Sequence, residues 1–325
     1  MMKKLWTLLL AVGMSICLCS CAQTPTAPPS SEQMRIAVSM SSRDQFLTTV
    51  ENAILEYAPK CDVDCTVWDA GNDYVVQLQH VQDAVEQGYD ALIINAVSPS
   101  LTRSIIREAG EMPVVFVNRK PEMEALTAGK QVFIGSDDRE AGRFQAAWLN
   151  DYAEEQGIDV LKLVYLTGIE GQDSTATRRD SLLEYLRVDC NFIYESTAQF
   201  DRAKAYNQVE ILVDNGVEFD VVVAQNDEMA IGAAQVLREA GITDCPVLGI
   251  DGTLAGRDAI ADGLLTFTVY QPGDEQGRAA VDAVLALYQG KDVKTMNIAH
   301  TTCSEDGLSL MIPYEAMDAQ RVTDF

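Results

Sequence analysis

Short apolar segments alternate with longer amphipathic segments along almost the whole chain from residue 34 onward, in two successive rounds. The short segments, such as "VVFV" and "VVVA", are apolar on both faces and rich in β-branched residues. Strands of this kind are typical of parallel sheets that helices cover on both sides. A chain of 325 residues is also long for a single hydrophobic core. The sequence therefore predicts an α/β fold with two doubly wound parallel-sheet lobes.

Six of the predicted strands end in polar side chains. These are Asn95, Asn118 with Arg119, Gln172 with Asp173 and Ser174, Gln225 with Asn226 and Asp227, Asp251, and Tyr270 with Gln271. Ligands bind beyond the carboxyl ends of the strands in doubly wound sheets. The pattern therefore predicts one cleft lined by polar side chains. Asn95 could instead cap a helix or complete a turn, and Asp227 is predicted to be the N-cap of the next helix.

The residue types at these strand ends fit a sugar ligand. A sugar hydroxyl both donates and accepts, so carboxylates can take its proton while amides and guanidinium groups donate to its oxygen. Phe46 and Phe200 would pack on the apolar face of a pyranose, although each could be a core residue, and Arg178 could be a solvated helix residue. The predicted ligand-binding residues are Asp44, Phe46, Asn118, Arg119, Gln172, Ser174, Arg178, Phe200, Asn226, Asp251 and Gln271.

The sequence lacks the motifs of common catalytic and nucleotide sites. It has no Gly-x-Gly-x-x-Gly, no Walker loop and no Gly-x-Ser-x-Gly elbow. His80 and His300, the only histidines, lack metal-ligand spacing and are predicted to be surface or packing residues. Asp44 and Asp251 leave open the acid/base pair of a hydrolase as a minor alternative. We therefore expect a binding protein, with no catalytic residue, cofactor or metal.

The first residues follow a different pattern from the rest of the chain. Lys3 and Lys4 precede an apolar run at 5–16, which is too short to span a bilayer comfortably. The following "LCSC" resembles a bacterial lipobox, which implies a signal peptide at 1–20 and lipidation of Cys21. An ordinary secretory signal is the alternative. Residues 21–33 are rich in Pro, Ser and Thr and are predicted to form a polar tether. We expect a lipid-anchored domain on the outer face of the cytoplasmic membrane.

Charge and cysteine content add two further expectations. The net charge of −25 argues against binding of nucleic acid and against a grip on anionic lipid other than through the lipid anchor. The motif "CDVDC" contains Cys61 and Cys65, which could pair, but the number of cysteines after Cys21 is odd. Mostly unpaired thiols are the favoured interpretation.

From about residue 34 to residue 313 the chain resembles the type I periplasmic binding proteins. It is most similar to the glucose/galactose-binding branch among the lipoproteins of sugar ABC transporters. The matching stretches are "DQF" at 44–46, "VVFVNRKP" at 114–121, "GSDDREAG" at 135–142, "QFDRAKA" at 199–205, "VVVAQNDEMAIGA" at 221–233, "GID" at 249–251 and "TVYQ" at 268–271. They follow the order of the family and extend over nearly the whole domain.

The resemblance implies roles for individual residues. Ligand positions of the family fall on Asp44, Phe46, Asn118, Arg178, Phe200 as the stacking aromatic, Asn226, Asp251 and Gln271. The chain departs from the galactose receptors in having Gln172 in place of a histidine, Ser174 in place of a carboxylate and Gln271 in place of an asparagine. These departures leave the identity of the sugar open. The calcium loop of that branch is absent, so no structural calcium is expected.

The resemblance also implies an architecture and a function. Three hinge segments, near 135–142, 270–275 and 302–308, would divide the chain into an N-terminal lobe, 34–136 plus 272–304, and a C-terminal lobe, 137–271 plus 305–325. Closure of the hinge would capture a galactose- or glucose-like monosaccharide, and a monomer would deliver it to an ABC permease with its ATPase subunits. A pentose, a nucleoside, a signalling molecule or a chemosensory role remain alternatives. The secretion signal counts against the repressor effector domains that share this fold.

Overall fold

The computed structural model describes residues 33–296, 298 and 300–324. The predicted signal peptide, Cys21 and nearly all of the predicted tether lie outside these residues. No helix within the described ranges combines the length and the apolar composition that a membrane span needs.

The first lobe is built on a seven-stranded sheet with the strand order β11-β12-β5-β4-β3-β1-β2. Its strands are β1 (Met34–Met40), β2 (Val63–Asp69), β3 (Ala91–Ile94), β4 (Val114–Val117), β5 (Gln131–Gly135), β11 (Thr302–Cys303) and β12 (Ser309–Met311). Its helices are α1 (Gln45–Tyr57), α2 (Tyr74–Glu86), α3 (Thr102–Ala109) and α9 (Gly273–Tyr288). All neighbouring strands are parallel except β11, which runs antiparallel to β12 at the edge.

The second lobe is built on a six-stranded sheet with the strand order β13-β10-β9-β8-β6-β7. Its strands are β6 (Val160–Thr167), β7 (Asp189–Thr197), β8 (Val221–Ala224), β9 (Val247–Leu248), β10 (Phe267–Tyr270) and β13 (Glu315–Asp318). Its helices are α4 (Asp138–Gln156), α5 (Asp173–Tyr185), α6 (Arg202–Asp214), α7 (Asp227–Glu239) and α8 (Leu254–Ala261). Only β13 is antiparallel to its neighbour. The predicted fold class is confirmed.

Short 3-10 helices connect or end several elements. They are η1 (Ala58–Cys61), η2 (Pro99–Leu101), η3 (Met123–Ala125), η4 (Val293–Thr295) and η5 (Val322–Asp324).

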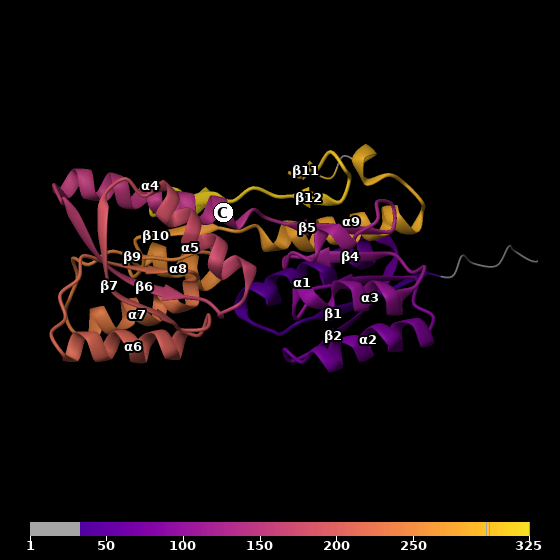
Figure 1. Cartoon of the computed structure of the whole chain (residues 1–325), viewed down its shortest axis with the longest axis horizontal. Coiled ribbons are helices and arrows are strands. Elements are labelled where there is room, and N and C mark those ends of the chain that lie inside the picture. Colours follow the sequence, from indigo (N-terminus) through magenta and orange to yellow (C-terminus); the bar gives the residue numbers. More distant parts are fainter. Residues whose placement is uncertain (1–32, 297, 299, 325) are drawn as a thin grey trace, which may run out of the picture. The chain divides into compact units, whose positions relative to one another are not determined.

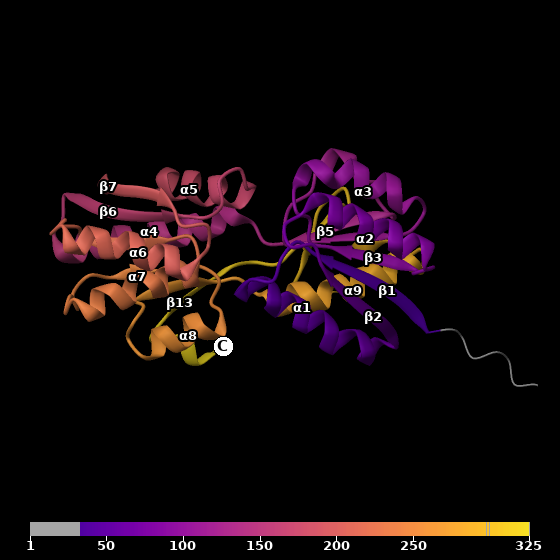
Figure 2. The ribbon, with the colours of Figure 1, turned by 90° about the horizontal axis from the view of Figure 1, so that it is seen from below.

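Each sheet is buried on both faces because its side chains alternate between two helix layers. In β1, Ile36 and Val38 pack with α1 and α9, whereas Ala37 packs toward α2 and α3. In β6, Val164 packs with α6 and α7, whereas Leu163 packs with α4. Figures 1 and 2 show these helices on either side of the strands. Burial on both faces explains why the strands are continuous apolar runs rather than alternating ones.

The chain passes from one sheet to the other three times, after β5, after β10 and after β12. The third crossing lies between Met311 and Glu315, downstream of the predicted position at 302–308. The difference arises because Ser309–Met311 pairs in parallel with β5, with Leu310 opposite Ile134. The segment 305–311, which the sequence placed in the C-terminal lobe, therefore belongs to the first lobe, where it forms β12 and the turn that leads into it. A strand of three residues has too little pattern to be recognised in a sequence.

Candidate ligand-binding site

A cavity of about 440 Å³ lies beyond the carboxyl ends of strands from both sheets. All eleven predicted ligand-binding residues line it. They come from separate segments of the chain, such as the start of α1, the end of β4, the turn before α5 and the end of β10. The site is therefore assembled by the two sheets and not by any local motif.

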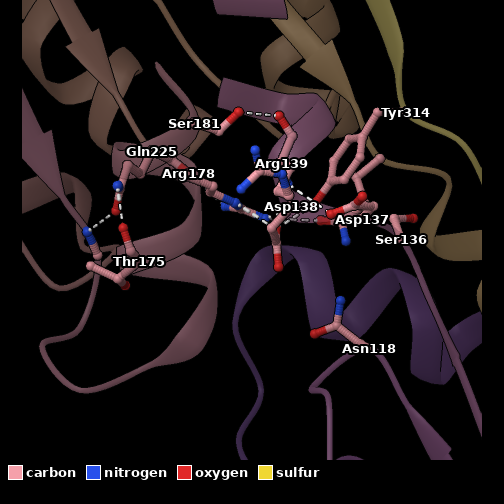
Figure 3. A network of polar contacts seen from close by, with 12 residues as sticks. Asn118, Ser136, Asp137, Asp138, Arg139, Thr175, Arg178, Ser181, Gln225 and Tyr314 are labelled. Carbon is pink, nitrogen blue, oxygen red and sulfur yellow. Dashed lines mark hydrogen bonds and ion pairs between the residues drawn. The ribbon is translucent and has the colours of Figure 1, made fainter. Parts of the chain in front are cut away.

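The wall of the cavity formed by the second lobe contains a hydrogen-bonded network around Arg178. Arg178 extends from α5, is 5% exposed, and donates from Nε to Asp138 Oδ1 at 2.8 Å. Nη1 donates to the backbone oxygen of Gln225 at 2.7 Å, and Nη2 donates to Tyr314 Oη at 3.0 Å and Gln271 Oε1 at 3.4 Å. Figure 3 shows Arg178 pointing toward Asp138 and Tyr314. The guanidinium thus joins α4, α5, β8 and the segment before β13.

Electrostatics favour the charged form of Arg178 despite its burial. Burial alone would lower its pKa, but Tyr314, Asp138 and Asp251 together raise the pKa of the guanidinium above its usual range. Tyr314 also donates to Asp138 at 2.8 Å, so the same carboxylate accepts two of the network's bonds. A buried charge with this many partners is held in one geometry before any ligand arrives.

The Asp251 side chain of this wall is left without a partner from the described part of the protein. It is 6% exposed, and no described residue forms a hydrogen bond or ion pair with its carboxylate. Its backbone has φ 117°, in the region that favours glycine, and is held by bonds to Val269 O and from the Gln271 N–H, at 2.8 and 2.9 Å. Burial raises the pKa of Asp251 well above its usual value, against the opposing effect of Arg178. A strained, buried carboxylate that faces a cavity is a strong candidate for a ligand contact.

The cap of α7 differs from the prediction. Asn226 is the N-cap, and its Oδ1 accepts a hydrogen bond from the Met229 N–H at 3.0 Å. Asp227 is the first residue of α7 and is fully buried, so its predicted role as the N-cap was wrong. Asn226 and Asp227 both have side chains suited to capping, and the geometry of the turn selects Asn226. The Asn226 side chain thus has only part of its hydrogen-bonding capacity left for a ligand.

Asp227 instead links three segments behind the cavity wall. Thr268 Oγ1 donates to Oδ1 at 2.5 Å, and the Thr253 N–H and Oγ1 donate to Oδ2 at 2.9 and 3.2 Å. Burial raises the pKa of Asp227 to about 7, although these donors act in the opposite direction. Thr253 follows Asp251 by two residues, so Asp227 fixes the loop that carries Asp251.

Gln225 was grouped with the polar strand ends but was not predicted to be a site residue, and it does not line the cavity. Its Nε2 donates to Tyr165 Oη at 2.9 Å and to Thr175 O at 2.8 Å, and its Oε1 accepts from the Gly168 N–H at 2.8 Å. The side chain is fully buried and fully used. Gln225, one of the three polar residues that follow β8, therefore has a structural role, since its bonds hold neighbouring segments together.

The wall formed by the first lobe has fewer internal bonds. Asp44 is the N-cap of α1, where Oδ1 accepts from the Leu47 N–H at 2.7 Å. Arg119 donates only from Nη1, to Ala96 O at 3.3 Å and Val97 O at 3.4 Å. In the part of the chain that the structure describes, its Nε and Nη2 have no partner. Burial lowers the pKa of Arg119 and raises that of Asp44, and each group partly offsets the shift of the other.

Two aromatic rings and two amides also belong to the predicted set. Phe46 is 9% exposed and joins the core next to α9 while it also lines the cavity. Phe200 lies in the turn between β7 and α6 with φ 60°. Asn118 also has a positive φ, 65°, and donates to Gln276 Oε1 at 3.4 Å. Gln172 is the N-cap residue of α5 but makes no capping bond with its side chain.

The cavity also contains residues that the sequence did not single out, namely Gln45, Leu47, Asn72, Val97, Ser98, Pro99, Lys120, Asp138, Ile169, Glu170, Gly171 and Glu228. Asp138 matters most because it pairs with Arg178. It stood within the matching stretch "GSDDREAG", but a partner 40 positions away gives no local signal. Glu228 pairs with Arg202 at 2.8 Å and so has a neutralising partner outside the cavity.

Neither histidine belongs to the cavity. His80 hydrogen bonds Ser39 Oγ at 3.0 Å, and His300 pairs with Glu275 at 2.8 Å. Among the described residues, no group of three or more His, Cys, Asp or Glu side chains could hold a metal ion. Cys61 and Cys65 are both free thiols.

A protein-family model described as a periplasmic binding protein domain matches residues 36–292. The chain belongs to this family. Among its relatives, a protein of Rhizobium meliloti named putative rhizopine-binding protein is 30% identical, over 87% of this chain and 89% of the relative. The ribose import binding protein of Escherichia coli is 29% identical, over 90% of this chain and 95% of the relative.

A solved structure supports the same assignment. An ABC transporter solute binding protein from Bacillus halodurans with bound myo-inositol superposes with a TM-score of 0.78 at 28% identity, over 91% of this chain and 98% of that one. This type I periplasmic binding protein therefore has relatives named as binding proteins rather than as enzymes. None of these three relatives is named for glucose or galactose. They therefore do not establish the predicted glucose/galactose-binding branch within the family.

Proposed function

We propose that this periplasmic binding protein captures a neutral monosaccharide or cyclitol in the cavity between its two sheets. The observation that carries the proposal is the carboxylate of Asp251, which is 6% exposed, lines the cavity and has no described partner. A carboxylate that faces a cavity and accepts no bond from the protein is available to accept one from a ligand hydroxyl.

Other residues of the cavity offer hydrogen-bond donors, an acceptor and apolar surface to such a ligand. Arg119 offers unused N–H donors, Gln271 Nε2 offers another, and Asp44 keeps one carboxylate oxygen that accepts no described bond. Hydroxyl groups can satisfy donors and acceptors at once. Phe46 and Phe200 provide apolar surface for the C–H groups of a ring. A volume of about 440 Å³ is at the small end of typical ligand pockets and suits one ring.

The relatives narrow the candidates. Ribose and myo-inositol, which appear in the names of the relatives, are both rings with several hydroxyl groups. We retain glucose and galactose as candidates because Asp44, Asn118 and Asp251 are the residues expected of that branch. Gln172 and Ser174, where the chain departs from it, line the same cavity and are proposed to decide between these sugars.

We further propose that the loaded protein delivers its ligand to an ABC permease outside the cytoplasmic membrane, as a monomer anchored through Cys21. Support comes from the family membership and from the lipobox-like sequence "LCSC". A pentose, a nucleoside or a signalling molecule as ligand, or a chemosensory role, would use the same cavity.

Thermal unfolding with a ligand panel tests the proposal. The panel contains glucose, galactose, ribose, myo-inositol, a nucleoside and an amino acid. A ligand at one hundred times its Kd should stabilise the fold by about 2.7 kcal/mol. Asp251→Ala should abolish the shift while still unfolding cooperatively, and Asp159→Ala, at an exposed carboxylate, should preserve it. A shift with the nucleoside or amino acid alone would refute the proposed ligand class.

A further inference from the structure

We infer that Gly168, a buried residue that does not line the cavity, is the positioning residue for the Phe200 ring. A Cβ atom at position 168 would lie 2.0 Å from Phe200 Cζ, 2.4 Å from Cε1 and 2.6 Å from Cε2. Gly168 is not among the residues with a positive φ, so its φ does not itself require glycine. The ring is therefore the reason that this position requires glycine. The consequence for ligand choice rests on the proposed function.

The backbone of Phe200 cannot easily move to release the ring. Gln199 and Phe200 have φ values of 57° and 60°, two successive residues in the left-handed region. Non-glycine residues persist there only where their surroundings hold them. The Ala198 N–H donates to Thr167 O and the Asp201 N–H donates to Ala198 O, both at 2.9 Å.

Gly168 is held just as firmly on the other side. Its N–H donates to Gln225 Oε1 at 2.8 Å, and its carbonyl oxygen accepts a hydrogen bond from Thr197 Oγ1. Gln225 is fixed in turn by its bonds to Tyr165 and Thr175. With both backbones anchored, an added methyl group at position 168 must displace the ring into the cavity.

The second aromatic ring shows a weaker version of the same arrangement. A Cβ atom at Gly273 would lie 3.1 Å from both Cε2 and Cζ of Phe46. A shift of a few tenths of an ångström would relieve that contact, whereas the contact at Gly168 requires a much larger one. The two rings should therefore respond unequally to the same change, and Phe200 should set the ligand's position more strictly.

A double-mutant cycle between Gly168→Ala and Phe200→Ala tests the inference. The ligand is the compound of the panel that binds the unchanged protein best, and a second binding compound measures selectivity. Gly168→Ala should weaken binding about tenfold and alter the affinity ratio of the two compounds. In the Phe200→Ala background the same change should alter affinity less than about twofold, because the methyl group no longer meets a ring. Gly273→Ala should have a smaller effect than Gly168→Ala.

Gly232→Ala is the control. Gly232 lies in α7 and does not line the cavity, and a Cβ atom there would lie 2.3 Å from the backbone oxygen of Arg202. The change adds a close contact away from both rings, so it should lower stability without altering the affinity ratio. Equal losses from Gly168→Ala in both backgrounds, or an unchanged ratio, would overturn the inference.

Urea unfolding without ligand provides an independent measurement. Gly168→Ala should lower the unfolding midpoint in the unchanged protein and much less in the Phe200→Ala protein. If no compound of the panel binds, the proposed function fails, and the ligand-free cycle still decides whether Gly168 positions the ring. Additive effects in that cycle would show that it does not.

Discussion

Arg178 and Arg119 both line the cavity, but only Arg178 has a carboxylate partner. Arg178 bonds to four residues and is 5% exposed. Arg119 is partly buried and bonds only to two backbone oxygens at 3.3 and 3.4 Å. The environment raises the pKa of Arg178, whereas burial lowers that of Arg119.

The difference shows that the two walls are built for different tasks. On the wall around Arg178 the guanidinium donors are used by the protein's own residues, which gives the second lobe a fixed surface and leaves the Asp251 carboxylate for a ligand. The wall around Arg119 keeps donors that the protein does not use, and so it has more to gain from a ligand. Arg178 and Arg119 are the same residue type, but the structure uses Arg178 mainly to stabilise the fold and leaves Arg119 mainly for binding.

Arg178→Met should produce the largest loss of stability among these changes. It would leave Asp138, whose side chain is 22% exposed, beside Tyr314 without its cation. Breaking a fully buried ion pair costs about 3–5 kcal/mol, which is the upper limit of the loss expected here. Urea unfolding without ligand measures the loss. Arg179→Met is the control, since the neighbouring arginine pairs with Glu195 in a more exposed position, where ion pairs contribute about 0–1 kcal/mol. Similar losses from both variants would remove the distinction between the two walls.

Much of the fold could be predicted from the sequence because it rests on local patterns. The apolar run that forms β8 and the polar residues that follow it marked both a strand end and a cavity wall. The third crossing could not be predicted because β12 is defined by its pairing with β5, distant in sequence.

That the predicted residues share one cavity could be anticipated from the sequence, but their bonds could not. Residue types near strand ends, together with the family resemblance, selected eleven residues that line one cavity. The contacts of Asp227 depend on Thr253 and Thr268, which lie far along the chain. The capping role of Asn226 depends on the turn geometry, which selects one of two adjacent residues that could both form the cap. Likewise, nothing near Arg178 in the sequence identifies Asp138 as its partner.

Asp227→Asn tests whether the protonation state of Asp227, behind the wall that carries Asp251, contributes to the stability of the fold. The folded state holds a proton on Asp227 up to a pH of about 7, whereas an unfolded aspartate loses it near pH 3.9. The carboxyl group's contribution to stability should therefore fall as pH rises from about 4 to about 7 and stay constant above that. Each pH unit in that window contributes at most about 1.4 kcal/mol to the difference between the two proteins.

Urea unfolding of both proteins across that pH range measures the difference. Thr268→Val, which removes a donor to Asp227 Oδ1, should extend the window to higher pH, because the ionised form loses a stabilising bond. A difference that does not vary with pH would contradict the role of Asp227.

Arg119→Met should weaken ligand binding with little effect on the fold. Hydrogen bonds to a charged group contribute about 1.5–3 kcal/mol, which corresponds to a loss of affinity of roughly 100-fold at the upper end. The unfolding free energy without ligand should change by less than about 1 kcal/mol, because its bonds to Ala96 and Val97 are long. Calorimetric titration and urea unfolding measure the two effects. Arg103→Met, on an exposed ion pair of α3, should change neither affinity nor stability appreciably.

The smallest effects are expected at the rim, where Lys120 and Glu170 line the cavity from the two lobes and are both exposed. Charges at such positions act mainly on the association rate of charged partners and are screened by salt. A neutral ligand gives them nothing to act on. Lys120→Gln and Glu170→Gln should therefore each leave the affinity within about twofold, at low and at moderate salt.

The pair of rim variants also separates the remaining ligand classes by sign. An anionic ligand would bind more weakly to Lys120→Gln and more tightly to Glu170→Gln, and a cationic ligand would show the reverse. Affinity changes of opposite sign in the two variants, which become smaller as salt is added, would mean that Arg119 or Asp251 contacts a charged group of the ligand instead of a hydroxyl. If neither variant changes the affinity, the ligand that meets the unused donors of the first wall and the unused carboxylate of the second is uncharged. Association and dissociation rates of the ligand, measured for both variants at two salt concentrations, distinguish a neutral ligand from a charged one.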